Sequence, residues 1–571
     1  MTNVASLIAG QHVLLNSETA RLEILNQNLS RGRFGRKTIR VFRNHNFELM
    51  APVLSSFAKY SGFEIEFLIG SYDDSMSFQD FSDREVDADM LWFDYSHYDL
   101  TEDSLLHFVV SRVKALRELS TAPIFICDSP NASHTAFNEA LGEIAKEIPG
   151  TLVLPVSECA QKLGDDFYDD SRSAYFGTRF HSRALTAIAR VIGLCYLPAV
   201  LRPRIKAIAI DLDNTLYSGV LGEDGVTGLG VTDGHLRLQE ELVKLGEAGI
   251  LLSIVSKNIK EDVEALFSTR NDFILRPEHL AGMQINWDSK ASNITKLAAA
   301  FNISPNDFLL LDDNLGELGQ TLAEINLIDI MHASDDPGVT AAELKVFPGL
   351  HSFGLTREDK LRTKDILSRQ QRSMRQNTQS YEEYLSQLDT EIEISLNQED
   401  AYTRLCELPI KTNQFNLALQ RLNATEVAWY LSNNNAFVVS LSLKDKLSNS
   451  GNIGAIYVHQ EGNLLMVDEL CVSCRALGRG LESFMIGQSL HAILHKASNV
   501  TTKVRFFYRI GARNQPALNW LSKFTQTVIS PIDNSTSHNV PELNIIDYPV
   551  GRLLEFVAST NRSPVKVSLR F

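Results

Sequence analysis

The sequence predicts a multidomain α/β protein, and three observations lead to that prediction. Its 571 residues exceed what one hydrophobic core organises, since single cores stop growing at roughly 250–300 residues. Short apolar runs alternate with amphipathic stretches from residue 37 to about 350, which is typical of parallel sheets covered by helices. Beyond residue 391 the pattern turns strand-rich, which predicts a third unit of α+β type.

The overall composition limits the class of protein and its partners. The formal net charge of -16 argues against nucleic-acid binding, because nucleic-acid-binding proteins need a positive surface to meet phosphates. No stretch approaches the ~20 apolar residues that span a bilayer, and the first residues lack the pattern of an export signal. Six scattered cysteines form no disulfide framework. We therefore expect a cytoplasmic protein that binds neither nucleic acid nor a membrane.

The first α/β unit is expected over residues 37–200, after a short helical lead-in at 1–36. Five apolar runs bounded by turn residues are predicted strands, at 37–44, 64–70, 88–95, 122–128 and 151–156. Three stretches between them have helical periodicity, at 47–62, 105–119 and 134–148.

The second unit is expected over residues 204–350, after a proline-punctuated crossing at 197–206. Its predicted strands are 206–211, 251–256 and 308–313. A charged segment at 355–390 begins with a capping-box pattern and is predicted to be a bridging helix. The strand-rich third unit follows at 391–530, and 531–571 carries no motif and is predicted to be a C-terminal tail.

Two aspartates stand at the mouth of a predicted buried strand in "AIAIDLDNT". Asp211 and Asp213 emerge at the carboxyl end of that strand, where open α/β sheets hold their ligands. A carboxylate placed there can attack a phosphorus atom, and Mg²⁺ offsets the repulsion between two anions. The alternative is an acidic strand-to-loop boundary without chemistry.

Three further segments extend this pattern, each close to the end of a predicted strand. Ser256 can donate a hydrogen bond to a phosphoryl oxygen, and Lys290 supplies a cation for the developing charge. Asp312 and Asp313 supply further oxygen ligands for a metal. Each residue alone also fits an ordinary structural role, as a helix cap, a surface charge or a turn residue. Their joint order favours phosphoryl chemistry.

The segments resemble the four motifs of the haloacid dehalogenase (HAD) superfamily, namely Asp211-Leu-Asp213-Asn-Thr215, Ser256-Lys257-Asn258, Lys290 and Asp312-Asp313. The resemblance implies a Rossmann-like domain in which Asp211 is the nucleophile and Asp213 the general acid/base. It implies phosphate binding by Thr215, Ser256, Lys257, Asn258 and Lys290. It also implies Mg²⁺ binding by Asp211, the backbone carbonyl of Asp213, Asp312 and Asp313.

The spacing of these motifs leaves no room for an inserted cap domain. About 45 residues separate Asp211 from Ser256, and about 34 separate Ser256 from Lys290. The site is therefore expected to be open to a large partner or covered by another domain.

A second informative stretch, "VDELCVSCRALGRGLESFMIG", lies in the third unit. Its loop, with Arg475, Gly478, Arg479 and Gly480, stands between a predicted strand and a helix, an arrangement that cradles pyrophosphate. It resembles the acyl-CoA loop of the GNAT acyltransferase fold. Cys474 lies beside Arg475, and a cation and helix-start amides would favour its thiolate. The alternative is a buried strand-end cysteine.

The combination of these units resembles the FkbH-like family, a HAD subfamily IIIC group, over residues 37 to about 530. The resemblance rests on "GVLGEDG", "SYEEYL", "KTNQFNL" and "SCRALGRG" together with the HAD motifs. It implies an enzyme that dephosphorylates the small acyl phosphate 1,3-bisphosphoglycerate. The enzyme would load the glyceryl or a related acyl unit on an acyl carrier protein in polyketide-type biosynthesis. Tyr217 and Ser218 stand where relatives often have Trp-Gly, which leaves the acyl unit open.

The resemblance also implies a path for the acyl group. Cys474 would accept it as a thioester and pass it to the phosphopantetheine arm of the carrier, and the loop would hold that arm or CoA. The basic residues Arg505, Arg509 and Arg513 are candidates for docking an acidic carrier protein.

Residues 37–200 resemble the SGNH-hydrolase-like region of this family. The first predicted strand ends in "FRNHNFE" without the expected serine, and Thr178 stands where an aspartate should precede His181. We therefore predict an inactive scaffold or docking unit. Alternatives for the whole chain are a simple HAD phosphatase whose GNAT unit only binds, an N-acyltransferase with a HAD passenger, and a non-catalytic scaffold.

Overall fold

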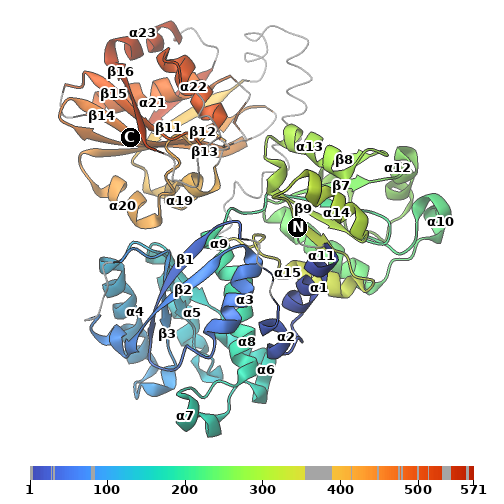
Figure 1. Ribbon diagram of the computed structural model, residues 1–571. Coiled ribbons are helices and arrows are strands. Elements are labelled where there is room, and N and C mark those ends of the chain that lie inside the picture. Colours follow the sequence, from blue (N-terminus) through green and yellow to red (C-terminus); the bar gives the residue numbers. More distant parts are fainter. Residues whose placement is uncertain are drawn as a thin grey trace.

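The chain folds into three α/β units, each built on its own sheet (Figure 1). The computed structural model describes residues 4–27, 29, 32–78, 84–353, 389–412, 414–446, 449–473, 476–477, 480–497, 500–511, 514–529, 542–560 and 565–571. Two sheets have five strands and the third has seven. The multidomain α/β class expected from the sequence is therefore confirmed. The predicted bridging helix lies outside the described residues, apart from positions 389 and 390.

The first unit is a parallel sheet in the order β2-β1-β3-β4-β5, and each of its strands overlaps a run predicted from the sequence. The strands are β1 (Arg36–Arg43), β2 (Glu64–Tyr72), β3 (Ala88–Trp92), β4 (Ile124–Cys127) and β5 (Thr151–Leu154). The helices are α1 (Val4–Leu15), α2 (Arg21–Leu25), α3 (Ala51–Ser61), α4 (Glu102–Leu119), α5 (Thr135–Glu147), α6 (Val156–Leu163), α7 (Asp170–Phe176), α8 (Ser182–Val191) and α9 (Leu197–Leu201), with a π-helical turn η5 (Ile192–Tyr196) between the last two.

The second unit is a parallel sheet in the order β10-β9-β6-β7-β8. Its strands are β6 (Ala207–Ile210), β7 (Leu251–Ser256), β8 (Leu280–Ile285), β9 (Phe308–Asp312) and β10 (Asp329–His332). Its helices are α10 (Leu221–Gly228), α11 (Asp233–Glu247), α12 (Lys260–Thr269), α13 (Lys290–Phe301), α14 (Leu315–Glu324) and α15 (Pro337–Lys345). The strand order reverses beside β6, so its carboxyl end lies at the switch point where such sheets bind ligands.

The third unit is a mixed sheet in the order β16-β15-β14-β13-β12-β11-β17. Its strands are β11 (Glu391–Leu396), β12 (Ala436–Lys444), β13 (Asn449–Glu461), β14 (Leu464–Val472), β15 (Lys503–Tyr508), β16 (Asn544–Pro549) and β17 (Lys566–Arg570). Its helices are α19 (Tyr402–Lys411), α20 (Ala424–Ser432), α21 (Glu482–Lys496), α22 (Gln515–Thr525) and α23 (Val550–Thr560).

The prediction that residues 531–571 form a C-terminal tail is wrong for most of that segment. Both outer strands of the third sheet come from it, because β16 pairs with β15 and β17 pairs with β11. Between them α23 packs on α21. Every residue of β17 is exposed, although its Val567 and Leu569 alternate with polar residues as is typical of a strand.

The first two units share one hydrophobic core. A single cluster of buried side chains extends from Leu7 through the first sheet to Leu350 at the end of the second unit. The lead-in helix α1 contributes to this continuity, because it contacts α3 of the first unit as well as α14 and β10 of the second. Figure 1 shows α1 beside α15 of the second unit. The buried apolar side chains of the third unit form two clusters separate from this core.

One helical stretch differs from the expectation that no segment could span a membrane. Ser182–Leu201, which comprises α8, η5 and α9, has the length and mean hydropathy (1.9) of a spanning helix. Within this fold 67% of that window is buried, and the stretch packs on α3. Arg190 in its middle donates to the carbonyl of Leu14. It therefore serves as an interior helix of the shared core.

Candidate active site

Three neighbouring strands of the second sheet deliver the predicted site residues to one edge. Asp211 follows β6 directly, Ser256 ends β7, and Asp312 ends β9. Because β6 lies between β7 and β9 and all three are parallel, their carboxyl ends meet at that edge. Lys290 reaches the same place from the first turn of α13. The structure therefore brings together residues up to about 100 positions apart.

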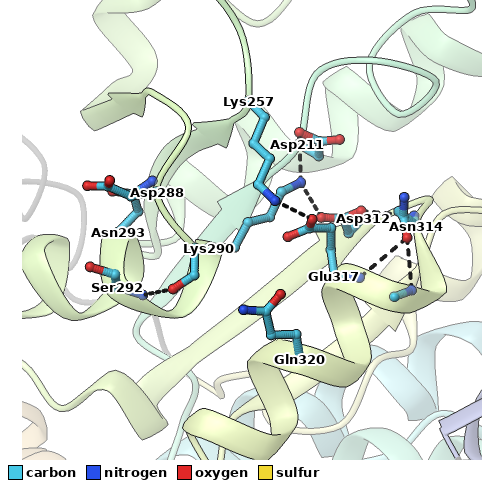
Figure 2. Close-up of polar contacts among 12 residues, drawn as sticks. Asp211, Lys257, Asp288, Lys290, Ser292, Asn293, Asp312, Asn314, Glu317 and Gln320 are labelled. Atoms are coloured by element: carbon cyan, nitrogen blue, oxygen red, sulfur yellow. Dashed lines mark hydrogen bonds and ion pairs between the residues drawn. The ribbon is translucent and has the colours of Figure 1, made fainter.

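The centre of the cluster is a buried lysine between two buried carboxylates (Figure 2). Nζ of Lys290 lies 2.9 Å from Oδ1 of Asp211 and also contacts Oδ2 of Asp312. Burial alone would lower the pKa of Lys290, but the two carboxylates raise it, so the ammonium stays charged. Burial and the Asp211 charge raise the pKa of Asp312 above its usual range. The lysine thus neutralises one of two anions that would otherwise repel.

The Asp213 carboxylate is held in one orientation by three donors. Tyr217 donates its hydroxyl to Oδ1 over 2.6 Å, and the Leu221 amide donates to the same oxygen over 3.0 Å. Nδ2 of Asn258 donates to Oδ2 over 3.0 Å. Asn214, whose φ of 52° is left-handed, turns the chain so that Tyr217 and Leu221 can reach back. A fixed carboxylate beside Asp211 can deliver or take a proton.

The other predicted phosphate-binding residues divide into two groups. Ser256 accepts a hydrogen bond from Asn258 over 3.1 Å, and both are buried at the edge. The Thr215 hydroxyl is also buried and has no partner among the described residues. The ammonium of Lys257 pairs with Glu317 in the first turn of α14 over 2.6 Å. The side chain of Lys257 is therefore engaged by a carboxylate, as Figure 2 shows.

Three carboxylates of the cluster fit a divalent cation. Asp211, Asp312 and Asp313 each offer an oxygen, and these atoms lie within 4.8 Å of one another. Carboxylate oxygens are the ligands that Mg²⁺ prefers. The Asp213 side chain does not join this group, since its oxygens face Tyr217, Leu221 and Asn258. Burial raises the pKa of Asp313, and a bound cation would reverse that effect.

A groove lies beside this edge, between α12 and the outer edge of β8. Its volume is about 680 Å³, and Val263, Phe267, Met283 and Ile285 line it together with polar groups. It begins near the site, because the amide of Asn286 donates to the carbonyl of Ser256 over 3.2 Å. None of the carboxylates or lysines of the cluster lines it.

The predicted thiol and loop of the third unit fall mostly outside the described residues. These are Cys474, Arg475, Gly478 and Arg479. Gly480 is described, with a left-handed φ of 71°, directly before α21. The expected order of strand, loop and helix is therefore present, with β14 before the loop and α21 after it.

The gap between β14 and β15 is closed by the chain itself. The two strands pair from Leu464↔Lys503 to Val467↔Phe506 and then separate. Beyond that point Leu417 donates its amide to the Leu470 carbonyl (3.0 Å) and accepts from the Arg509 amide (3.0 Å). The segment from Phe415 to Leu417, the inserted segment, therefore lies between the separated strands.

Two buried side chains fix the inserted segment. Glu469 accepts amide hydrogens from Leu417 (3.1 Å), Ala418 (3.0 Å) and Gln420 (2.6 Å), besides that of its neighbour Leu470. Asn514 donates to the carbonyls of Asn416 (3.0 Å) and Arg509 (2.9 Å). Asn514 is thus a structural anchor of the inserted segment.

The arginines considered for carrier docking are partly engaged. Arg505 forms a two-pronged ion pair with Asp547 on β16, at 2.7 and 3.0 Å. Arg509 donates to the Ala418 carbonyl over 3.3 Å, and Arg513 lies outside the described residues.

In the first unit the hydrolase-like positions make local contacts. His45, at the end of β1, is buried, stacks on Trp92 at 4.9 Å and contacts the Thr178 hydroxyl through Nδ1 over 2.9 Å. His181 accepts from the Arg183 amide and so caps α8. Asp94 accepts from Ser96 and pairs with Arg179 over 3.1 Å. These roles are those of strand-end and capping residues.

Comparisons with known proteins give likenesses to parts of the chain. No protein-family model matches the chain, and no curated protein matches it. The crystal structure of the N-terminal part of the protein BF1531 from Bacteroides fragilis, containing a phosphatase domain complexed with Mg, is 18% identical with a TM-score of 0.45; the alignment covers 60% of this chain and 99% of that one.

Two acetyltransferase structures match shorter parts. GCN5 of Tetrahymena is 11% identical with a TM-score of 0.18, and the alignment covers 28% of this chain and 95% of that one. A GNAT-family acetyltransferase from Streptococcus pneumoniae is 14% identical with a TM-score of 0.20, covering 28% and 99% respectively. Because these TM-scores are all below 0.5, none of the likenesses assigns an activity to this chain.

Proposed function

We propose that this chain is a Mg²⁺-dependent phosphatase and acyltransferase that loads an acyl unit, glyceryl or a relative of it, on a carrier protein. The observation that carries the proposal is the edge cluster, in which the Lys290 ammonium and three carboxylates gather around the end of β6. Asp213, oriented by three donors, stands beside them.

The residues divide the phosphatase work between them. Asp211 attacks the phosphorus atom, and the bond from phosphorus to the leaving oxygen breaks while Asp213 gives that oxygen a proton. Asp213 then takes a proton from water, which attacks the aspartyl phosphate, releases inorganic phosphate and restores Asp211. Lys290 and Ser256 hold the phosphoryl oxygens. When bound, Mg²⁺ would be held by Asp211, Asp312 and Asp313 and would neutralise phosphoryl charge.

The same chemistry limits the substrate. Attack on the phosphorus of an acyl phosphate releases a free acid, which can no longer form a thioester. The site must therefore act on a phosphate ester and leave the acyl phosphate bond for a thiol. A molecule that carries both groups, as 1,3-bisphosphoglycerate does, satisfies this requirement and agrees with the family resemblance.

The acyl transfer itself needs a thiol. The Cys474 thiolate would attack the acyl carbonyl carbon, the bond from carbon to the phosphate oxygen would break, and inorganic phosphate would leave. The phosphopantetheine thiol of the carrier would then attack the thioester and restore the Cys474 thiolate. The setting we propose is a cytoplasmic, polyketide-type pathway.

A second candidate is a phosphatase whose third unit only binds. The inserted segment favours it over acyl transfer, because Phe415–Leu417 occupies the space between the separated ends of β14 and β15.

The test is to incubate the full chain with 1,3-bisphosphoglycerate, Mg²⁺ and a phosphopantetheinylated carrier, measuring phosphate and intact masses. Asp211→Asn should stop release of the ester phosphate, whereas Asp233→Asn, an exposed residue at the start of α11, should not. Cys474→Ala should abolish the mass gain on the enzyme, and Cys406→Ala should keep it.

Other results select the alternatives. Ester hydrolysis with no mass gain on any carrier favours the simple phosphatase. Acylation of an amine, with no phosphate release, favours an N-acyltransferase. Activity of neither kind in the wild-type chain would leave a non-catalytic scaffold and overturn the proposal.

A further inference from the structure

The lead-in helix α1 carries two polar residues on the side that faces the second unit. Its other buried side chains are apolar, among them Leu7, Ile8 and Leu14. Gln11 is fully buried and donates to the carbonyl of Ile330 on β10 over 2.9 Å. Its oxygen accepts from the His332 amide over 3.4 Å. The helix is therefore hydrogen-bonded to β10, the strand that pairs with β9 beside the acidic loop, which we define as residues 312–314, from the end of β9 to the start of α14.

His12 continues this contact with side-chain groups. Its Nδ1 lies 2.8 and 2.9 Å from the two carboxylate oxygens of Glu343 on α15. The carboxylate is only 2% exposed, so it keeps a proton on Nδ1 and fixes the ring. The hydrogen bond to Glu343 raises the pKa of His12. On its other side Nε2 of His12 meets Nδ1 of His332 over 3.3 Å.

His332 connects this chain of contacts to the cluster. It stands opposite Asp312 where β10 pairs with β9, and the amide of the next residue, Ala333, donates to the Asp312 carbonyl over 2.9 Å. The contacts thus run from Glu343 through two imidazole rings to β10, whose backbone holds the carbonyl of Asp312, one of the three clustered carboxylates.

We propose that His12 and His332 are positioning residues for the acidic loop, and that α1 supports the metal site through His12. The inference deepens the proposed function and rests on it for the identity of the cation. Groups behind the metal ligands orient them, and removing such groups typically costs 10–100-fold in metal affinity. Here the two rings stand behind β10, which holds the backbone at Asp312, next to Asp313 in the carboxylate cluster.

A merely structural role for these histidines predicts a different result. If α1 only fills the core, loss of the imidazole of His12 lowers the free energy of unfolding but leaves the affinity of folded protein for Mg²⁺ unchanged. A positioning role lowers that affinity in protein that remains folded. The two roles therefore separate in a binding measurement made without substrate.

The experiment compares Mg²⁺ binding by calorimetry in full-length wild type, His12→Ala and His332→Gln. We expect His12→Ala to weaken Mg²⁺ binding by about 10-fold or more. His332→Gln keeps a polar side chain beside His12 and leaves the β10–β9 pairing in place, so it should weaken binding less. His235→Gln is the matched control, because His235 caps α11 through Thr232 in the same unit. It should bind Mg²⁺ as wild type does.

Kinetics give a second readout. Phosphate release by His12→Ala should recover at high Mg²⁺ with an unchanged KM for the ester. Wild-type Mg²⁺ affinity in folded His12→Ala would overturn the inference. If that variant does not fold, Glu343→Gln, which leaves the ring in place, is measured in its stead and must also weaken Mg²⁺ binding. If wild type binds Mg²⁺ but hydrolyses no ester, the proposed function is wrong. The Mg²⁺ affinities of wild type and His12→Ala would still test whether His12 positions the metal ligands.

Discussion

Replacement of Lys290 by methionine should lower the free energy of unfolding and raise the affinity for Mg²⁺. In wild type the ammonium lies 2.9 Å from Asp211 and also contacts Asp312, and all three side chains are buried. Lys290→Met keeps the aliphatic stem but leaves two buried carboxylates without their cation. Removing one partner of a buried ion pair costs about 3–5 kcal/mol. We expect that loss in the free energy of unfolding measured in EDTA.

Magnesium should repair much of this loss. With the Lys290 ammonium gone, its repulsion of an incoming cation is removed, so Lys290→Met should bind Mg²⁺ more tightly than wild type. A ligand present at 100 times its Kd stabilises the folded state by about 2.7 kcal/mol. The variant should therefore gain more from Mg²⁺ than wild type does, while its phosphate release is lost because the phosphoryl group has no lysine.

The assay is urea denaturation of the full chain in EDTA and in Mg²⁺, with Lys296→Met as the control. Lys296 lies on the same helix, and its pair with Asp288 is about half exposed, so its removal should cost at most about 1 kcal/mol. Equal Mg²⁺ stabilisation of wild type and Lys290→Met would refute the reasoning. So would an unchanged urea midpoint in EDTA.

Variants at three further residues test buried polar contacts. Glu469→Ala should lower the free energy of unfolding by about 4 kcal/mol or more, since each buried amide left without an acceptor costs about 1–3 kcal/mol. Glu469→Gln keeps the oxygen shared by three of the four amides, so its loss in urea denaturation should be about half as large. Burial lowers the pKa of His45 from 6.5 to about 3. Between those two pH values the unfolded chain binds a proton that the folded protein does not, so the free energy of unfolding should fall by about 1.4 kcal/mol for each pH unit that the pH is lowered. His45→Phe should flatten that slope. Arg202→Met breaks a buried 2.7 Å pair with Asp329 and should cost about 3–5 kcal/mol; thermal unfolding should show the first two units weakened together.

Much of the candidate site could be predicted because its signals are local. The run before Asp211 is short, apolar and fully buried as β6. Strand-end residues of a parallel sheet must meet at one edge, so the sequence placed Ser256, Lys290 and Asp312 beside Asp211. The same local signals located the strands of the first unit.

The missed features depend on contacts between distant parts of the chain. His12 and Glu343 are 331 positions apart, and no local pattern marks their pairing. The inserted segment carries no strand pattern of its own, since its partners Leu470 and Arg509 are supplied by the third sheet. Lys257 stands within a motif, yet Glu317, 60 residues further on, decides where its ammonium lies.

The position of α1 has a consequence for how the chain matures on the ribosome. The helix is made first, whereas its partner Glu343 follows 331 residues later, which at ~5–20 residues per second is a delay of roughly 15–65 seconds. During that interval α1 can already pack on α3 of the first unit. The polar groups of Gln11 and His12 stay hydrated until β10 and α15 have been synthesised and can pair with them. The acidic loop therefore acquires its final support only when the earliest and latest parts of the first two units meet.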